Sequence, residues 1–321
     1  MSNVSVTRPL PEAGLADLRA AHTVEIYDPA VHGDADEDRL ITLARGAEAL
    51  ISTVVDPVSE RVLAASSHLR IVAQFGVGTD NIDLEAARAH DIVVTNTPEV
   101  LTDATADFAF ALLLAVARHL RPADVFVRDG AFRRWETTLL LGMELRGKVL
   151  GIVGLGRIGR AMARRALGFG MRIVYHNRRP TNFTFERQLS AQYVSFEELL
   201  AQSDVVSLHC ALNDESYHLL DDNAFGRMKP SALLVNTARG PIVDEQALVR
   251  ALQHGQLAGA GLDVFEREPE VHPGLLVHPR VVLAPHLGSA TVEARTAMAR
   301  MAAEAVLAAL DGAESIPYRV V

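Results

Sequence analysis

The sequence contains only one cysteine, Cys210, which rules out an intramolecular disulfide and a zinc site built on several thiolates. Its lysines and arginines form no long run, and the formal net charge is −9 with a pI near 5.7. Binding to nucleic-acid phosphates needs a basic surface, which such a chain lacks. We therefore expect a small-molecule partner, no nucleic acid, no metal and a reducing compartment.

Long hydrophobic runs are also absent. The most apolar stretch, residues 108–117, has about half of the roughly 20 residues that a membrane-spanning helix needs. The amino terminus has no charged segment followed by an apolar core, so it does not resemble a secretory signal. These absences predict a cytoplasmic protein that does not associate with membranes.

Aromatic residues are scarce, at 5%, whereas hydrophobic residues make up 49% and charged residues 22% of the 321 residues. This balance is typical of a globular chain whose core packs aliphatic side chains. A chain of this length exceeds what one hydrophobic core usually supports, which predicts two domains.

Short runs rich in valine and isoleucine alternate with stretches of helical composition, a rhythm typical of βαβ units. After Pro98, a long helix is expected to begin at Thr102 or Asp103, because either residue can cap it. One side of this helix would carry Phe108, Leu112, Ala115 and Leu120. The strands predicted before it are residues 24–26, 49–55, 69–75 and 92–95.

A second series of strands begins after Lys148. Its runs are apolar at consecutive positions, as strands covered on both faces require, so we predict an α/β architecture with a doubly wound parallel sheet. Only residues 177–192 break the pattern, and we interpret them either as part of a nucleotide site or as a solvated loop. A final helix is predicted over residues 291–310. The later strands are expected at residues 172–176, 204–209, 232–236, 259–264 and 281–284.

Gly154, Gly156 and Gly159 form a G-x-G-x-x-G pattern between an apolar run and a helical segment. In that context the first glycine permits a tight turn and the second lets the backbone approach a pyrophosphate. The third allows the helix and the strand to pack closely. The helix amino terminus adds N–H donors and the positive end of a dipole. The pattern therefore predicts a dinucleotide-binding turn.

The second strand of this series is followed by Asn177, Arg178 and Arg179. An acidic residue is expected about 20 residues beyond the glycine turn if the ribose 2′-hydroxyl of NAD is to be held. Asn177 is neutral and does not repel a 2′-phosphate, and the two arginines can pair with one. We therefore favour NADP(H) as the cofactor and leave NAD(H) open, since the arginines could instead end an ordinary solvated loop.

Three later strands are each followed by a residue suited to hydride-transfer chemistry, namely Arg239, Glu268 and His286. The carboxyl ends of parallel strands meet at one edge of the sheet, where ligands bind. A 2-keto acid needs a cation for its carboxylate and a proton for its carbonyl oxygen. Arginine stays charged and binds bidentately, and histidine titrates near the working pH. We assign Arg239 to substrate binding and polarisation, His286 to proton transfer and Glu268 to orienting His286.

The segments that contain these residues resemble the D-isomer-specific 2-hydroxyacid dehydrogenases, from about residue 69 to residue 291. The similar segments include GVGTDNIDLEAA, LRGKVLGIVGLGRIGRAM, NTARGPIVDE, GAGLDVFEREPE and PHLGSAT. The resemblance implies a flavodoxin-like substrate domain, residues 1–100 and 287–321, with an inserted Rossmann NAD(P)-binding domain, residues 101–286. It also implies a homodimer formed through the inserted domain and the long helix that begins near residue 102.

The resemblance implies roles for further residues. The backbone N–H groups of Val77 and Gly78 would meet the substrate carboxylate, and Arg157 with Ile158 would cover the pyrophosphate. Asp263 would face the nicotinamide ring. The other cofactor contacts would come from Cys210, Thr237, Ala238, Gly288 and Ser289.

Within the family, VLTDATAD and the basic strand end most resemble the glyoxylate and hydroxypyruvate reductases. GLDVFEREPEV is similar to the hydroxyphenylpyruvate reductases, and a 3-phosphoglycerate dehydrogenase-like activity is a further alternative. Residues 132–142 depart from the reductases' pattern, which leaves the exact substrate open, and Trp135 either borders the site or packs at the surface. The alternative that is not an enzyme is a cofactor-sensing corepressor, since such proteins resemble this family in fold and keep a similar triad. The absence of a long disordered tail before Val321 weighs against this alternative.

Overall fold

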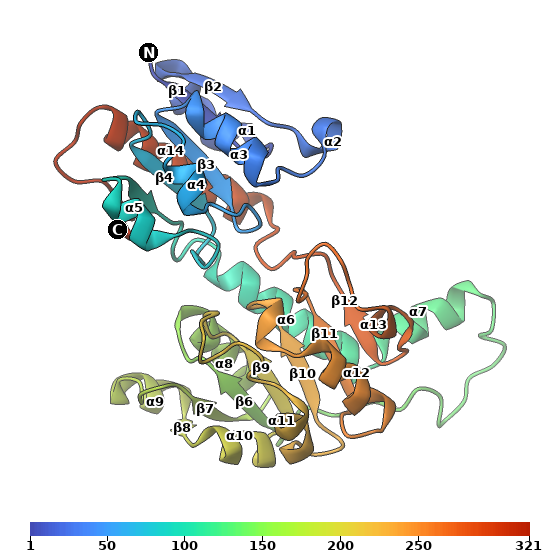
Figure 1. Cartoon of the computed structure of the whole chain (residues 1–321). Helices are drawn as coiled ribbons and strands as arrows, with labels where there is room; N and C mark the ends of the chain where they lie inside the picture. Colours follow the sequence, from blue (N-terminus) through green and yellow to red (C-terminus); the bar gives the residue numbers. More distant parts are fainter. The chain divides into compact units, whose positions relative to one another are not determined.

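The computed structural model describes the whole chain, residues 1–321, and the chain divides into two compact units (Figure 1). Unit 1 comprises Met1–Leu101 and Ser289–Val321, and unit 2 comprises Thr102–Gly288. The boundaries expected from the resemblance fall one residue earlier at the first division and two residues earlier at the second. The roles assigned to the two domains stay predictions.

Unit 1 contains a parallel five-stranded sheet in the order β2-β1-β3-β4-β5. This is the flavodoxin-like strand order. The first strand was not predicted, because its four residues alternate Asn and Ser with valine and give too short an apolar run. The strands are β1 (Asn3–Val6), β2 (Thr23–Ile26), β3 (Ala49–Thr53), β4 (Ile71–Phe75) and β5 (Val93–Thr95).

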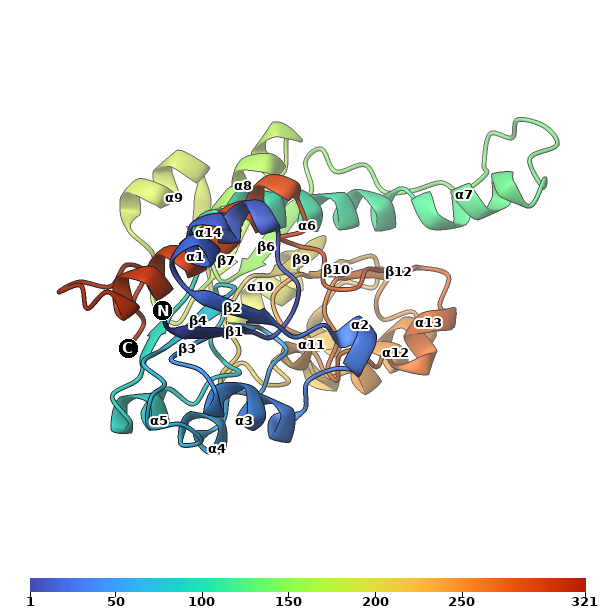
Figure 2. The same ribbon diagram turned by 90° about the horizontal axis from the view of Figure 1, so that it is seen from above.

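Helices cover both faces of the unit 1 sheet, as Figure 2 shows. One face packs against α1 (Glu12–Ala21) and α14 (Val292–Leu310), so the chain's last helix completes the core of its first strands. The Thr291 side chain caps α14 by accepting a hydrogen bond from the Ala294 N–H. The other helices are α2 (Pro29–His32), α3 (Glu37–Arg45), α4 (Glu60–Leu63) and α5 (Leu84–Ala89), of which the last three pack on the opposite face.

Unit 2 contains a parallel seven-stranded sheet in the order β12-β11-β10-β9-β6-β7-β8. The strand order reverses between β6 and β9, which makes the sheet doubly wound and confirms the predicted α/β architecture. Its central strands are buried on both faces, as their continuous apolar runs predicted. The strands are β6 (Val149–Val153), β7 (Arg172–His176), β8 (Ala191–Tyr193), β9 (Val205–Leu208), β10 (Leu233–Asn236), β11 (Gly259–Leu262) and β12 (Val281–Leu283).

Two helical layers enclose this sheet. One contains α6 (Thr102–Ala117), α8 (Arg157–Gly168) and α9 (Phe183–Leu189). The other contains α10 (Phe196–Gln202), α11 (Asp222–Arg227), α12 (Glu245–Gln253) and α13 (Pro273–Val277). A short 3₁₀ turn, η1 (Gly240–Ile242), precedes α12. No helix of the chain is both long enough and apolar enough to span a bilayer.

Residues 177–192 are more ordered than the sequence indicated. The stretch contains α9 and the start of β8, and the Asn182 side chain caps α9 by accepting a hydrogen bond from Thr184 N–H. The Tyr175 hydroxyl accepts a hydrogen bond from Thr181 N–H and donates one to Glu186. The stretch lacks an apolar period because these local polar contacts, rather than a buried stripe, organise it.

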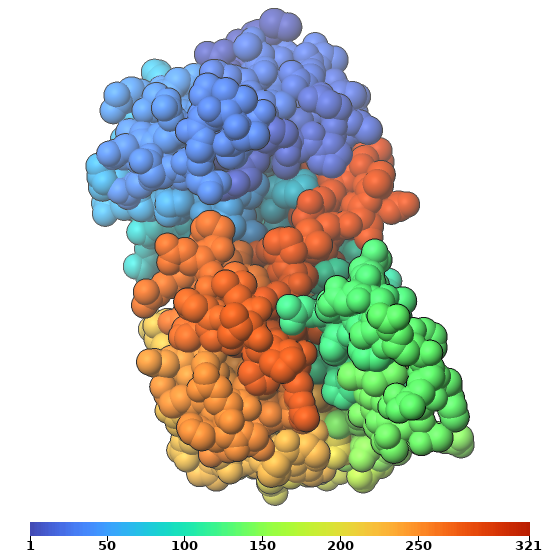
Figure 3. All heavy atoms as spheres, turned by 90° about the vertical axis from the view of Figure 1, so that its right-hand side faces the viewer, coloured from blue at the N-terminus to red at the C-terminus, as the bar shows by residue number.

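The long helix after Pro98 ends at Ala117, earlier than its apolar pattern indicated. Leu120 instead begins a separate helix, α7 (Leu120–Arg128), which buries none of its residues. Figure 2 shows α7 and the loop after it projecting from the rest of unit 2, and Figure 3 shows the same segment, in green, at the surface. Apolar side chains exposed on it are Leu120, Val125, Val127, Phe132, Trp135, Leu140 and Leu141.

Candidate active site

The structure brings the three predicted chemical residues to one edge of the unit 2 sheet. Strands β10, β11 and β12 are parallel neighbours, and Arg239, Glu268 and His286 each follow the carboxyl end of one of them. Ligands of open parallel sheets bind outside this edge. The apolar strand runs were therefore sufficient to predict that these residues share an edge.

His286 and Glu268 form a direct hydrogen-bonded pair. The Nδ1 atom of His286 lies 2.8 Å from Oε2 of Glu268, and the other carboxylate oxygen accepts the Phe265 N–H at 3.0 Å. Both side chains are partly exposed, at 31% for His286 and 21% for Glu268. With Nδ1 engaged by the carboxylate, Nε2 is the ring atom left for proton transfer to a ligand.

Asp263 anchors the backbone that follows His286. One carboxylate oxygen accepts the Leu287 N–H at 2.6 Å and the other accepts the Gly288 N–H at 2.7 Å, while its main-chain carbonyl accepts the His286 N–H. Its burial raises the pKa of Asp263 to about 6, although both backbone hydrogen bonds and the nearby His286 oppose this rise. Nothing in the sequence indicated this anchoring role, and the predicted contact with the nicotinamide stays a prediction.

The turn that presents Arg239 is shaped by Asn236, the last residue of β10. Its side chain donates to the Arg239 carbonyl at 2.9 Å and accepts the Ala238 N–H at 3.0 Å. The Arg239 guanidinium donates to the Ala238 carbonyl at 2.8 Å. Thr237 in the same turn is buried, and its hydroxyl has no hydrogen-bond partner in the chain. A buried hydroxyl without a partner suits a position that a ligand completes.

The glycine turn between β6 and α8 has the geometry that its pattern predicted. Gly154 has φ +96°, and a Cβ there would lie 2.5 Å from the Cys210 nitrogen. A Cβ on Gly159 would lie 2.2 Å from the Gly154 carbonyl oxygen. Helix α8 can therefore approach the turn this closely only because residue 159 has no side chain. Helix α8 begins at Arg157 and no side chain caps it, which leaves its first N–H groups for an anion.

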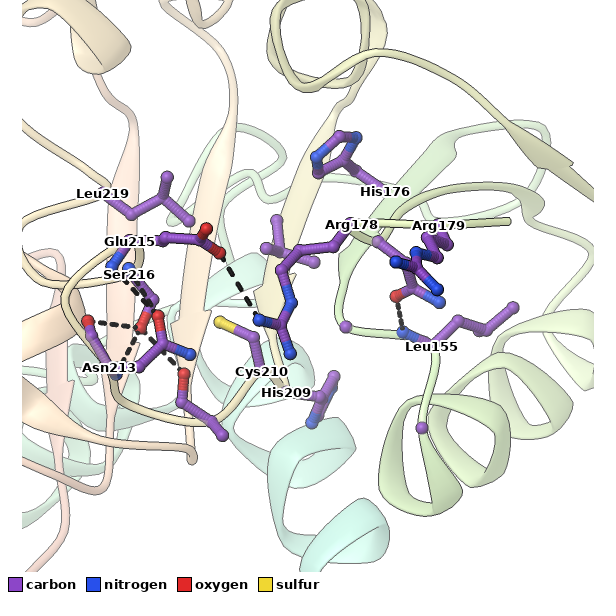
Figure 4. Close-up of a pocket in the computed structure, with 15 residues that line it drawn as sticks. Leu155, His176, Arg178, Arg179, His209, Cys210, Asn213, Glu215, Ser216 and Leu219 are labelled. Carbon is purple, nitrogen blue, oxygen red and sulfur yellow. Dashed lines mark hydrogen bonds and ion pairs between the residues drawn. The ribbon is translucent and has the colours of Figure 1, made fainter. Parts of the chain in front are cut away.

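A pocket of about 960 Å³ opens beside this turn within unit 2 (Figure 4). Its walls include Gly154 and Gly156 of the turn, Cys210 after β9, and the three residues after β7, Asn177–Arg179. The glycine turn, which suits a pyrophosphate, and the basic residues after β7, which suit a phosphorylated ribose, both line this pocket. The lining therefore fits a dinucleotide. Predicted cofactor residues outside its lining are Arg157, Ile158, Gly159, Thr237, Ala238, Asp263, Gly288 and Ser289.

The residues after β7 have partners that the sequence did not reveal. The Asn177 Oδ1 atom accepts the Leu155 N–H at 2.7 Å, so this side chain holds the glycine turn. The Arg178 guanidinium lies 3.5 Å from the Glu215 carboxylate, and both side chains are largely exposed. Figure 4 shows the two side chains meeting beside Cys210. Glu215 belongs to the loop after β9, whose sequence gave no sign of facing Arg178.

Two further groups in the pocket are neutral at physiological pH. Burial lowers the pKa of His209 to about 4, and its Nε2 lies 2.9 Å from the Ser207 hydroxyl. Burial also raises the pKa of the Cys210 thiol to about 11. The thiolate is the reactive form of cysteine. Cys210 is therefore protonated near neutral pH, and it lines the pocket beside the glycine turn.

Comparisons with known proteins agree with this geometry. The sequence profile described as D-isomer specific 2-hydroxyacid dehydrogenase, NAD binding domain, matches residues 110–288. A glyoxylate reductase from Thermococcus litoralis is 47% identical over 314 residues, covering 96% of this chain and 94% of that protein. A crystal structure of a glyoxylate reductase from Paecilomyes thermophila has a TM-score of 0.88 at 34% identity, with 99% of this chain and 98% of that chain covered.

The chain is also similar to a solved structure that contains a bound cofactor and a bound dicarboxylic acid. It is an NADPH-dependent glyoxylate/hydroxypyruvate reductase from Sinorhizobium meliloti, in complex with NADP and malonate. Its TM-score is 0.86 at 33% identity, and the match covers 100% of this chain and 97% of that one.

Proposed function

Because this chain belongs to the D-isomer-specific 2-hydroxyacid dehydrogenase family, we propose that it reduces glyoxylate or hydroxypyruvate to the 2-hydroxy acid with NADPH. The observation that carries the proposal is the hydrogen-bonded His286–Glu268 pair, which lies at the same sheet edge as Arg239. The glycine turn and its pocket belong to the same unit. Where the product is chiral, we expect the D isomer, in line with the family.

Each of the three side chains has a task that its chemistry suits. When bound, a reduced nicotinamide supplies the hydride to the carbonyl carbon. Arg239 binds the substrate carboxylate and polarises the carbonyl, because its guanidinium stays charged and can donate two parallel hydrogen bonds. His286 gives a proton from Nε2 to the carbonyl oxygen as negative charge develops there. Glu268 holds the ring through Nδ1 and stabilises its protonated form.

The preference for NADPH rests on the residues after β7. Asn177 is neutral and Arg178 and Arg179 line the pocket, so a 2′-phosphate would meet cations there rather than a carboxylate. Glu215 opposes this preference, because it already pairs with Arg178. The Sinorhizobium meliloti relative is described as NADPH-dependent, which supports the same choice for this chain.

The choice of substrate rests on the relatives, since several of them are glyoxylate reductases at 45–47% identity. A panel of steady-state assays tests it, with glyoxylate, hydroxypyruvate, hydroxyphenylpyruvate and phosphohydroxypyruvate, each with NADPH and NADH. We expect the highest kcat/KM for the two small acids with NADPH. A higher kcat/KM for hydroxyphenylpyruvate or the phosphorylated acid would overturn the substrate, and a strong NADH preference would overturn the cofactor.

We also propose a homodimer, and we expect it in the cytoplasm. The support for the homodimer is the exposed apolar side chains of α7 and the loop after it, a segment that projects from unit 2 (Figure 2). Apolar groups gathered on a projecting segment gain free energy when another surface covers them. A second copy of the chain is the partner that the resemblance implies.

A further inference from the structure

The loop after β4 has three successive carbonyl groups that are all held by other parts of unit 1. The Gly76 carbonyl accepts the Thr97 N–H at 2.9 Å, and the Val77 carbonyl accepts the Asn96 side-chain amide at 2.8 Å. The Gly78 carbonyl accepts the Gln74 side-chain amide at 3.2 Å. Three consecutive peptide groups are thus fixed in orientation, two of them by side chains.

A fixed carbonyl also fixes the next N–H, because the two groups share one planar trans peptide and point in opposite directions. The restraints on the carbonyls of residues 76–78 therefore orient the N–H groups of Val77, Gly78 and Thr79. None of these three N–H groups donates a hydrogen bond within unit 1. Consecutive N–H groups that are oriented and unused form a binding place for an anion.

The two side chains that hold the carbonyls are themselves held. Gln74 is fully buried, and its Oε1 atom accepts the Ser52 hydroxyl at 2.7 Å. Its amide also donates to Asn81 at 2.7 Å, and the Asn81 amide donates to the carbonyls of Thr53 and Asp56. This network leaves Gln74 no alternative orientation that satisfies all of its polar atoms.

Asn96 is held through its backbone. Its N–H donates to the Tyr318 carbonyl at 3.2 Å, and the residue before it, Thr95, pairs with Arg319. The carboxyl-terminal segment thus fixes the position from which the Asn96 side chain reaches Val77. The loop is restrained on one side by β4 and on the other by the chain end that pairs with β5.

We propose that Asn96 is a positioning residue for recognition of the substrate carboxylate. By holding the Val77 carbonyl it sets the direction of the Gly78 N–H before the acid binds, while Gln74, through the Gly78 carbonyl, holds the next peptide group of the same loop. The inference rests on the proposed function and on the prediction from the resemblance that the Gly78 N–H, along with Arg239, meets the carboxylate of the 2-keto acid. Oriented donors bind an anion more tightly than mobile ones because less conformational freedom is lost on binding.

The test uses Asn96→Ala in the full-length protein. Loss of one restraint at Val77 should raise the KM for hydroxypyruvate and the dissociation constant of oxalate, measured with NADPH bound, by about three- to tenfold. The dissociation constant of NADPH and kcat should stay within about twofold, because Asn96 belongs to unit 1, the cofactor pocket lies within unit 2, and the proposed role of Asn96 is in binding the acid. Oxalate is a suitable probe because it presents carboxylates and is not reduced.

Asn3→Ala is the matched control. The Asn3 amide also donates to a backbone carbonyl in unit 1, that of Gly46 at 3.4 Å, so the same chemistry is removed elsewhere. This control should leave both constants unchanged. Thermal unfolding of the two variants shows whether either has lost the fold.

Equal KM and oxalate affinity in Asn96→Ala and Asn3→Ala would overturn the inference. A joint loss of kcat, NADPH binding and oxalate binding would overturn it too, because it would indicate a general structural role. The oxalate measurement needs no turnover, so it separates the two proposals. Wild-type protein that binds oxalate but reduces no 2-keto acid contradicts the proposed function alone, whereas wild-type protein that does not bind oxalate contradicts both.

Discussion

The imidazole of His286 and the carboxylate of Glu268 are joined by a hydrogen bond of 2.8 Å between Nδ1 and Oε2. The carboxylate is fixed in turn by the Phe265 N–H, so the pair is held within one loop and one strand end. A carboxylate at Nδ1 selects the ring tautomer and favours the protonated ring. The proposal that His286 is the proton donor rests on this relationship.

Glu268→Gln tests that relationship. The amide keeps the size of the side chain but removes the negative charge that stabilises the protonated ring. We expect kcat/KM for hydroxypyruvate to fall by about 10²- to 10³-fold. Glu270→Gln, an exposed carboxylate on the same loop, is the control and should leave kcat/KM unchanged. A kcat/KM of Glu268→Gln within about twofold of wild type would mean that the pair does not support proton transfer.

The placement of Arg239, Glu268 and His286 could be predicted from the sequence because each follows a continuous apolar run. Such runs identify buried parallel strands, and parallel strands bring their carboxyl ends to one edge. The glycine turn was predictable because its conformation is local: the spacing of the three glycines between a strand and a helix is enough to indicate it.

Contacts between segments far apart in the sequence could not be predicted. The anchoring of Leu287 and Gly288 by Asp263, and the pairing of Arg178 with Glu215, depend on how separate loops meet in space. The strand β1 was missed because its run is short, and the helix α9 because polar contacts organise it. Local sequence patterns therefore predict the strands, the helices and the sheet edge of the site. The hydrogen-bond and ion-pair partners of the site residues depend on tertiary contacts that those patterns do not report.

Asp263 should make stability depend on pH with a defined sign. Its folded pKa of about 6 lies above the ordinary value of 3.8, so the folded chain binds this proton more tightly than the unfolded chain. The stabilisation from this group is therefore present at low pH and is lost as pH rises from about 4 to about 6. Its contribution to the free energy of unfolding should fall by roughly 3 kcal/mol across that range.

Urea unfolding of wild type and Asp263→Asn at a series of pH values measures this effect. The difference in unfolding free energy, wild type minus variant, should decrease as pH rises through the range and then level off. His209→Asn is the contrasting variant. The folded pKa of His209, about 4, lies below its ordinary value of 6.5, so the unfolding free energy of wild type minus that of this variant should increase as pH rises toward 6.5. A pH-independent difference for Asp263→Asn would contradict the raised pKa.

Arg178→Ala tests the cofactor preference. Removal of a cation that pairs with a 2′-phosphate should raise the dissociation constant of NADPH by about tenfold or more and change that of NADH by less than about twofold. Arg187→Ala removes an arginine that packs near Phe183 on α9, outside the pocket lining, and serves as the control. Equal losses of NADPH and NADH affinity in Arg178→Ala would show that this residue does not read the 2′ position.

Glu215→Gln gives the converse prediction. If the 2′-phosphate of NADPH binds Arg178 as proposed, the Glu215 carboxylate competes for Arg178 and repels the phosphate, so its neutralisation should tighten NADPH binding by about two- to fivefold without improving NADH binding. Asp214→Asn changes the same charge on the adjacent residue, which does not line the pocket, and should have little effect. Weaker NADPH binding in Glu215→Gln would instead mean that Glu215 holds Arg178 in place for the phosphate.

The homodimer is tested on α7. Val127 is 59% exposed and lies on the projecting segment, so Val127→Lys places a charge on the surface that a second copy would cover. Sedimentation should show a dimer for wild type and a shift toward monomer for the variant, because an unpaired charge is costly in an apolar interface. Val31→Lys, on an exposed valine of unit 1, is the control. A monomeric wild type, or a variant that stays fully dimeric, would contradict the assignment of this surface.

Whether His286 gives the proton in the reduction of a 2-keto acid is tested by the rate of NADPH-dependent hydroxypyruvate reduction in wild type and His286→Asn, with NADPH affinity measured in parallel. We expect wild type to form D-glycerate, kcat to fall by about 10²- to 10⁴-fold in the variant, and NADPH affinity to stay unchanged. A variant that retains kcat within about tenfold, or a wild type that forms no 2-hydroxy acid, would contradict this expectation.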